Sequence, residues 1–316
     1  MPIERVAGRW IERFETERAE PYSPKRFKNS HEIREAGIFT LRMNSQHTAS
    51  ISTANYKLYN TPMSKLSTEP YKGVQDFYPE DMAVEKYIFS VWRKVAEQFG
   101  YVEYSASPLE PTELYAEKSG EEIVNEQTFT FTDRGGRSVT LRPEMTPTLA
   151  RMVAAKRREL KFPLRWYSIP NLFRYEKPQR GRRREHYQFN ADLLGFDALE
   201  ADKEVLAMAY AIMKEFGAKD EDYEIRINNA ETKLFKEIAP NLVHDPSLAR
   251  GQAYYTGMVF EIFDKNTENP RAIAGGGRYD NLLELFGVEP LPAVGFAMGD
   301  ITLRDFLETH KLGPYA

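Results

Sequence analysis

Two segments in which polar and apolar residues alternate, on either side of an arginine-rich loop, constrain the fold of this chain more than any other feature. In the sequence LFRYE, Arg174 and Glu176 would lie on the same face of a strand. In HYQFNADLLG, the same holds for Gln188, Asn190 and Asp192. A period of two is typical of a β-strand with one polar and one apolar side. If the loop folds the strands back as an antiparallel pair, these side chains converge on one polar surface of a sheet.

Such a surface predicts a binding site, because an arginine, two carboxylates and an amide are costly to bury without a ligand or partner groups. The combination suits a ligand with both phosphate and amine character. The loop between the strands adds five cations: Lys177, Arg180, Arg182, Arg183 and Arg184. Two plainer interpretations stay open, since a charge cluster is commonly a solvated surface, and Arg174 with Glu176 could form a cross-strand ion pair.

The rest of the chain predicts an α+β fold around a largely antiparallel sheet. Apolar residues at helical spacing predict helices over 82–99, 148–160 and 199–216. Alternating segments on either side of Arg134-Gly135-Gly136 predict a β-hairpin over 128–142. Further strands are predicted over 165–176, 186–196, 223–227, 258–263 and 293–297. Hairpins without a regular βαβ rhythm favour the antiparallel arrangement.

The first 62 residues differ in composition from the rest of the 316-residue chain. Residues 1–20 could form a charged amphipathic helix, and the polar run 44–62 resembles a linker. We therefore expect residues 1–62 to be an N-terminal extension, possibly poorly ordered, and residues 63–316 to form the main domain.

Composition excludes several classes of function. No stretch approaches the roughly 18 uncharged apolar residues of a membrane span, and the N-terminus lacks the apolar centre of a signal peptide. The absence of cysteine excludes disulfides and thiolate chemistry, and the five histidines never occur at metal-ligand spacing. The net charge of −4 gives no general attraction for nucleic acid. These features predict a soluble, cytoplasmic protein with no metal site built from its own side chains.

Three further segments hold residue types suited to binding an anion or an amine. LRPEMTP places Glu144 and Thr146 between a predicted strand and a helix, and LARGQAYYTG places Arg250 before a pair of tyrosines. AIAGGGRYD supplies three successive glycines, which allow a ligand to approach the backbone closely. Neither glycine-containing segment matches a dinucleotide-binding or Walker A pattern, so any nucleotide site is of another type.

Taken together and in order, these segments resemble the histidyl-tRNA synthetase family of class II aminoacyl-tRNA synthetases. KGVQDFYPEDM is similar to the family's entry segment, FGYVEYSASPLEP to its first motif and FRYEKPQRGRRREHYQ to its second. LARGQAYYTG and AIAGGGRYD resemble its two histidine-specific segments, and VGFAMGD the start of its third motif. The resemblance extends from Tyr71 to about His310 and implies a class II synthetase-like antiparallel sheet flanked by helices.

The resemblance also implies an activity and a set of site residues. The chain would form histidyl-adenylate from L-histidine and ATP, accompanied by Mg²⁺, and transfer histidine to tRNA(His); its first motif implies a homodimer. Arg174 and Arg250 would act in catalysis. ATP would be bound by Arg174, Glu176, Arg182 and Arg304. Histidine would be bound by Glu144, Thr146, Gln188, Asp192, Tyr254, Tyr255, Gly275, Gly276 and Tyr279.

The sequence departs from the family pattern in four places. Gln252 and Ala253 stand where an apolar residue and an aspartate are usual. Ile301 and Thr302 occupy the positions of an acidic residue and the ATP-binding arginine of the third motif, for which Arg304 is the nearest substitute. The stretch from Asp192 to Arg250 is short, which predicts a reduced insertion domain. The chain ends where an anticodon-binding domain would begin, so we expect that domain to be absent.

Two alternatives remain at this point. Domain content favours a non-catalytic histidine-binding paralogue that resembles the regulatory subunit of ATP phosphoribosyltransferase, although such a sensor has no need of two phosphate-facing arginines. An RNA-binding pseudo-synthetase using the loop 177–184 is disfavoured by the net charge.

Overall fold

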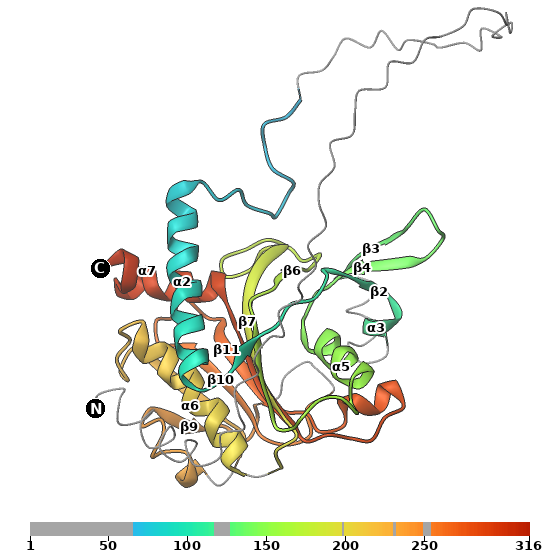
Figure 1. The fold of residues 1–316 in the computed structure, drawn as a ribbon. Coiled ribbons are helices and arrows are strands. Elements are labelled where there is room, and N and C mark those ends of the chain that lie inside the picture. Colours follow the sequence, from blue (N-terminus) through green and yellow to red (C-terminus); the bar gives the residue numbers. More distant parts are fainter. Residues whose placement is uncertain (1–65, 117–126, 198, 230–231, 249–253) are drawn as a thin grey trace, which may run out of the picture. The chain divides into compact units, whose positions relative to one another are not determined.

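A computed structural model describes residues 66–116, 127–197, 199–229, 232–248 and 254–316. Residues 70–316 belong to one compact unit built on a nine-stranded sheet (Figure 1). The strands run in the order β1 (Val102–Glu103), β5 (Leu164–Ser168), β7 (Glu185–Leu194), β12 (Ala293–Gly299), β11 (Ala272–Arg278), β10 (Val259–Asp264), β8 (Tyr223–Ile227) and β9 (Leu242–His244). β6 (Asn171–Phe173) pairs with β7 beside β5.

All the pairings along this order from β5 to β8 are antiparallel, and only the outermost strands β1 and β9 pair in parallel. This confirms the predicted α+β fold with a largely antiparallel sheet.

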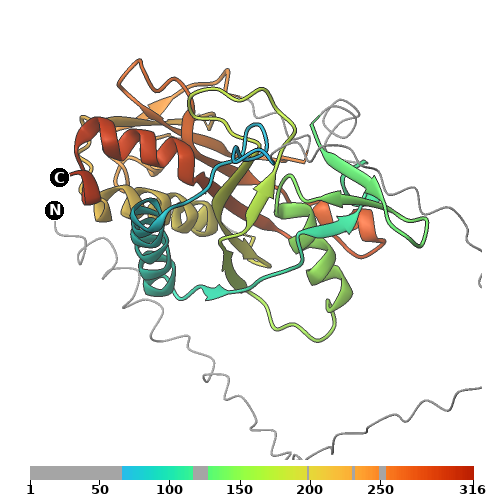
Figure 2. The same ribbon diagram turned by 90° about the horizontal axis from the view of Figure 1, so that it is seen from above.

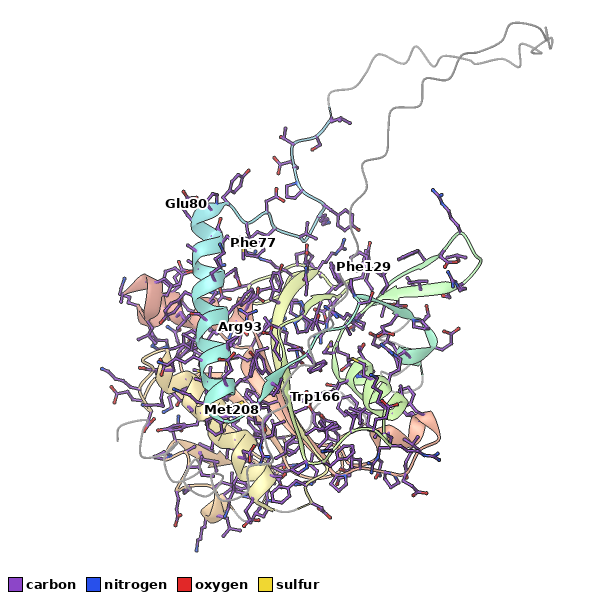
Figure 3. The ribbon with its side chains drawn as sticks, viewed as in Figure 1. Phe77, Glu80, Arg93, Phe129, Trp166 and Met208 are labelled. Atoms are coloured by element: carbon purple, nitrogen blue, oxygen red, sulfur yellow. The ribbon has the colours of Figure 1, made fainter. Side chains whose placement is uncertain are left out.

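Three helices pack on one face of the large sheet: α2 (Pro79–Gln98), α6 (Leu199–Glu215) and α7 (Asp300–His310), as Figures 1 and 2 both show. They bury the main hydrophobic core, in which Trp92 and Met208 are fully inaccessible to solvent. Figure 3 shows Glu80 near the beginning of α2. Met208, which belongs to α6, lies near the C-terminal end of α2. Phe189 and Leu193 reach this core from β7, so the apolar side of β7 faces the helices.

The opposite face of the sheet carries α5 (Thr146–Ala155), the 3₁₀ helix Leu282–Phe286 and a smaller sheet (Figure 2). The smaller sheet has the order β2 (Leu109–Pro111), β4 (Ser138–Leu141) and β3 (Phe129–Thr132), and α3 (Glu113–Ala116) follows β2. α5 packs with the 3₁₀ helix Leu282–Phe286, and a second apolar core forms here. Trp166, labelled in Figure 3, packs with that core. The polar side of β7 faces this half of the domain. The shorter 3₁₀ helices are Thr232–Leu234 and Gly313–Tyr315.

Most predicted elements are confirmed, with boundaries shifted by a few residues. The hairpin is β3 and β4, and the first and third predicted helices are α2 and α6, followed by Gly100 and Gly217, which both have positive φ angles. Two predictions were wrong in extent. The helix predicted to reach residue 160 ends at Ala155, and the strand predicted over 165–176 is interrupted at Pro170, so Arg174 lies just beyond β6.

Several elements were not predicted as such, β11 and α7 among them. The glycine run of AIAGGGR forms strand β11, although glycine is depleted in strands, and residues 300–310 form helix α7. The expected extension, residues 1–62, lies outside the described residues. None of the helices in the described ranges is long and apolar enough to cross a bilayer.

Candidate active site

The polar side of β7 lines a pocket of about 80 Å³, called here the polar pocket. That volume is room for several water molecules. Gln188, Asn190 and Asp192 alternate along β7 with residues of the main core, as their period of two predicted. The pocket is lined by Glu144, Thr146, Arg174, Gln188, Asn190, Asp192, Tyr254, Tyr255, Gly275, Tyr279, Gly295, Phe296 and Ala297. Eight of the nine residues predicted to bind histidine therefore lie around one cavity.

Asp192 is the most deeply placed acid of the polar pocket, with only 4% of its surface exposed. Burial raises its pKa to about 7, although a hydrogen bond from the Tyr279 hydroxyl to Asp192 Oδ1 lowers it. Burial and the adjacent carboxylate of Asp192 raise the pKa of Tyr279 well above its usual value, so Tyr279 stays a hydrogen-bond donor. Near neutral pH, Asp192 is thus an acceptor close to its own titration point.

Glycine is required beside Asp192 for steric reasons. Gly295 of β12 is the cross-strand neighbour of Asp192, and a Cβ at position 295 would lie 2.2 Å from Asp192 Oδ1. Gly276, predicted to bind histidine, does not line the polar pocket. A Cβ there would lie 2.1 Å from the carbonyl oxygen of Gly295, so Gly276 instead lets β11 and β12 pack closely. Gly275 does line the pocket.

The wall opposite β7 combines an acid with aromatic rings. Glu144 precedes α5 and accepts a hydrogen bond of 3.2 Å from the Tyr254 hydroxyl. The ring of Tyr254 contacts both Tyr255 and Tyr279, with centroids 5.0 and 5.8 Å apart. Aromatic rings in such contacts hold one another in place, which keeps the hydroxyl groups in fixed positions.

A second cavity, of about 400 Å³, shares part of its lining with the polar pocket and is called here the arginine pocket. Arg174, Gln188, Gly275 and Ala297 line both cavities. Arg174 is held at this junction because its Nε donates a 2.9 Å hydrogen bond to the carbonyl oxygen of Pro143. A guanidinium is therefore shared by a small polar cavity and a larger, cation-rich one.

The arginine pocket is rich in guanidinium groups, and its titratable residues favour a net positive charge. Glu176 and Arg182, both predicted to bind ATP, line it and form an ion pair of 2.6 Å. Burial and the charge of Arg174 lower the pKa of His186 to about 3, so this imidazole is neutral. Burial and the nearby Glu85 raise the pKa of Asp300 to about 8, which keeps Asp300 largely protonated at pH 7.

The loop 177–184 is not the free cation cluster that its composition suggested. Arg184 is buried, stacks 3.9 Å from the centroid of the Tyr175 ring, and donates to the carbonyl oxygens of Glu176 and Lys72. Arg180 donates to Asn269. The loop is thereby attached to the entry segment and to β10–β11, which weakens the interpretation as an exposed RNA-binding patch.

Arg304, predicted as a substitute for the third-motif arginine, points elsewhere. Its guanidinium pairs with Glu85, lies 3.6 Å from Asp81 and packs 5.6 Å from the centroid of the Phe77 ring. It lines neither the polar pocket nor the arginine pocket. Glu85 is 1% exposed, and burial raises its pKa against the opposing effect of Arg304. In this arrangement Arg304 neutralises a buried acid of α2.

We expect Arg304→Ala to lower the free energy of unfolding by about 3 kcal/mol, because it leaves the buried carboxylate of Glu85 unpaired. Urea titration followed by circular dichroism measures this loss. The double variant Glu85→Gln/Arg304→Ala should recover at least half of it. A stable Arg304→Ala protein with weakened ATP binding would contradict this assignment and restore the nucleotide role.

One predicted catalytic residue is not described by the structure, and some residues that line the pockets were not predicted. Arg250 lies outside the described residues. Sequence reasoning missed Gly295, Arg271 and Asp300 as pocket-lining residues; the small residue within VGFAMGD was a signal for Gly295. In the described part of the chain, no group of three or more histidines or carboxylates is placed to hold a metal ion.

An antiparallel sheet with helices packed on one face, and with an arginine between two polar cavities on the other, matches the catalytic domain of class II aminoacyl-tRNA synthetases. The family model described as histidyl-tRNA synthetase matches residues 73–242 and 229–302. The chain belongs to the histidyl-tRNA synthetase family.

Named relatives and solved structures agree. The chain is 39% identical to a histidine–tRNA ligase of Leptospira biflexa, over 79% of this chain and 76% of the relative. It is 37% identical to a histidine–tRNA ligase of Thermoplasma volcanium, over 77% and 76%. The crystal structure of apo S. aureus histidyl-tRNA synthetase superimposes with a TM-score of 0.66 at 29% identity, covering 78% of this chain and 72% of that one.

A structure titled as an ATP phosphoribosyltransferase regulatory subunit/histidyl-tRNA synthetase, from Bacillus halodurans C, has a TM-score of 0.67 at 20% identity. It covers 77% of this chain and 84% of that one, and at this identity the likeness concerns the fold alone.

Proposed function

We propose that this chain is a histidine–tRNA ligase, which activates L-histidine with ATP and transfers it to tRNA(His). The observation that carries the proposal is the shared position of Arg174 between the polar pocket and the arginine pocket. An amino acid in the first cavity and a nucleotide in the second would meet at this guanidinium. The alternative, a histidine-binding regulatory paralogue, has less support among the named relatives.

Histidine would occupy the polar pocket. Asp192 would accept a hydrogen bond from one imidazole nitrogen, and Tyr255 would donate to the other, because a neutral imidazole offers one donor and one acceptor. Glu144, Thr146 and Gln188 would hold the α-amino group. A buried carboxylate opposite an N–H discriminates strongly against amino acids that lack it, since its acceptor would then remain unpaired.

ATP would occupy the arginine pocket, with Glu176 accepting from the adenine amino group and Arg174 contacting the α-phosphate. The histidine carboxylate oxygen attacks the α-phosphorus, the bond from that phosphorus to the bridging oxygen breaks, and pyrophosphate leaves. Arg250 is proposed to stabilise the same phosphate from another side. The protein's contribution is orientation and charge stabilisation, with no covalent enzyme intermediate.

Mg²⁺ would enter with ATP as part of the substrate, bound mainly by phosphate oxygens. Glu261 of β10 lines the arginine pocket and supplies the kind of oxygen ligand that this ion prefers.

The resemblance of the first motif also supports a homodimer. Val102 of β1 and Leu109 of β2 are 64% and 49% exposed, in the segment where a pairing surface was expected. Exposed apolar residues on short edge strands are suited to burial by a second copy. We propose cytoplasmic action, where tRNA is charged.

The test is histidine-dependent exchange of labelled pyrophosphate into ATP by the purified chain. We expect exchange with histidine and background rates with the other amino acids. Histidine binding by calorimetry without any exchange would overturn the enzyme proposal and favour the regulatory paralogue. Charging of tRNA(His) is then measured separately, because adenylation needs only the two pockets.

A further inference from the structure

Four guanidinium groups line the arginine pocket: Arg174, Arg182, Arg183 and Arg271. Only two carboxyl groups of its lining, Glu176 and Glu261, oppose them, because Asp300 is largely protonated at pH 7. Glu176 is already paired with Arg182. The excess of positive charge suits a polyanion, and the triphosphate of ATP is the polyanion of the proposed function.

Arg271 differs from several other arginines of this domain in forming no direct ion pair within the described ranges. Arg165, Arg278 and Arg304 each pair with a buried carboxylate. For Arg271, no ion pair or hydrogen bond of the guanidinium occurs within the described ranges. Burial and the neighbouring charge of Arg182 lower its pKa, against the opposing charge of Glu176. Like charges brought together in a partly buried cavity repel each other, and a bound anion would relieve that cost.

The segment that carries Arg271 is fixed before any ligand arrives. Asn269 is 7% exposed, donates 2.7 Å and 3.0 Å hydrogen bonds to Asp264 and to Thr309 of α7, and accepts one from Arg180. The chain enters β11 immediately after Arg271. A guanidinium on such a support loses little conformational freedom when it binds an anion.

The Arg271 side chain runs past two residues that line the same pocket. Its stem passes Gly181, where an added Cβ would lie 2.9 Å from Arg271 Cδ and 3.4 Å from Thr302 Cγ2. Arg271 and Thr302 are thus neighbours in the lining of the same pocket. Thr302 is the position at which the family resemblance predicted an ATP-binding arginine, and Arg304 does not reach this cavity.

We infer that Arg271 binds the β- and γ-phosphates of ATP, the part that leaves as pyrophosphate, in place of the arginine that position 302 lacks. This inference rests on the proposed function. Arg174 lines both cavities and contacts the α-phosphate. Arg271 lines only the arginine pocket and contacts the β- and γ-phosphates.

The test compares the affinities of ATP and AMP for the purified full chain, measured by equilibrium dialysis with labelled nucleotide. Arg271→Ala should weaken ATP binding by about 10- to 100-fold, as expected for loss of a charged hydrogen bond, and change AMP binding by less than twofold. In pyrophosphate exchange, the KM for ATP should rise while the KM for histidine stays constant. The control variant is Arg137→Ala, which removes a cation from the exposed β3–β4 hairpin, away from the pocket.

A second variant keeps the inference falsifiable if Arg271→Ala also loosens the fold. Adding Thr302→Arg to Arg271→Ala restores a guanidinium from the neighbouring position and should recover at least a third of the lost ATP affinity. Unchanged ATP affinity in Arg271→Ala, or an equal loss for AMP, would overturn the inference and leave the proposed function standing. Wild-type chain that binds ATP through Arg271 but shows no histidine-dependent exchange would overturn only the proposed function. Wild-type chain that binds no ATP would overturn both.

Discussion

Replacing Arg174 by alanine should slow histidine-dependent pyrophosphate exchange by about 10²- to 10³-fold, the usual cost of removing one donor to a developing negative charge. Arg174 lies where the two pockets meet, and its Nε is anchored to the Pro143 carbonyl oxygen, so the rest of its guanidinium is directed by the protein before substrates bind. The loss should appear mainly in kcat, whereas the dissociation constant of ATP should rise less than tenfold. Single-turnover formation of adenylate separates the two.

Arg174→Lys is the informative control, because it retains the charge but cannot form the planar two-pronged contact of a guanidinium. We expect it to recover only a small part of the rate. Arg250→Ala should resemble Arg174→Ala if both arginines act on the same phosphate. An Arg174→Ala protein that keeps more than a tenth of the wild-type kcat would exclude Arg174 from the chemical step.

Replacing Asp192 by asparagine should reduce kcat/KM for histidine by about 10²- to 10³-fold, as expected when one partner of a buried charged hydrogen bond is lost. The asparagine is nearly isosteric, and its side-chain oxygen can still accept the hydrogen bond from Tyr279. The change therefore removes charge rather than shape. Exchange measured as a function of histidine concentration gives the effect, with the KM for ATP as the internal control.

The pH dependence of the same variant distinguishes a binding role from a structural one. The pKa of Asp192 is about 7 in the folded chain against about 3.9 in an unfolded one, so ionisation opposes folding. Stability is highest below pH 4 for this group and falls as pH rises toward 7. Asp192→Asn should thus be more stable than wild type at pH 8, by about 2 kcal/mol, while using histidine poorly.

For wild type, the KM for histidine should rise as pH falls below 7, because protonation removes the negative charge of Asp192 and turns one of its oxygens into a donor. Asp192→Asn should lose that component of the pH profile. A variant that is destabilised at pH 8 and binds histidine normally would show that Asp192 is a packing residue.

The polar side of β7 was predictable because a strand's period of two leaves no freedom in which side chains share a face. Once Gln188 and Asp192 were assigned to one strand, their convergence followed, and the structure places both in the polar pocket. The antiparallel sheet followed in the same way from the hairpins. Strand β11 did not, because its glycines carry no side-chain pattern and are accommodated by the close approach of β12.

The arginines show the limit of such reasoning. In the loop 177–184, side chains of the same type lie in different environments. Arg184 is buried against Tyr175, whereas Arg182 pairs with Glu176 in the arginine pocket. Arg184 also donates to Lys72, and Arg180 to Asn269; these partners lie 112 and 89 residues away, so a local sequence pattern does not encode the contacts. For the same reason the sequence position of Arg304 predicted a contact with ATP, and no local pattern singled out Arg271.

The pairing of Asp192 with Gly295 across β7 and β12 has an evolutionary consequence. Asp192, which we propose selects the amino acid, lies on an interior strand of the sheet, and its carboxylate fits there because the facing Gly295 lacks a side chain. A lineage that acquired a side chain at position 295 would have to change Asp192 as well, since a Cβ there would collide with the carboxylate. Drift in surface loops would leave the choice of amino acid untouched.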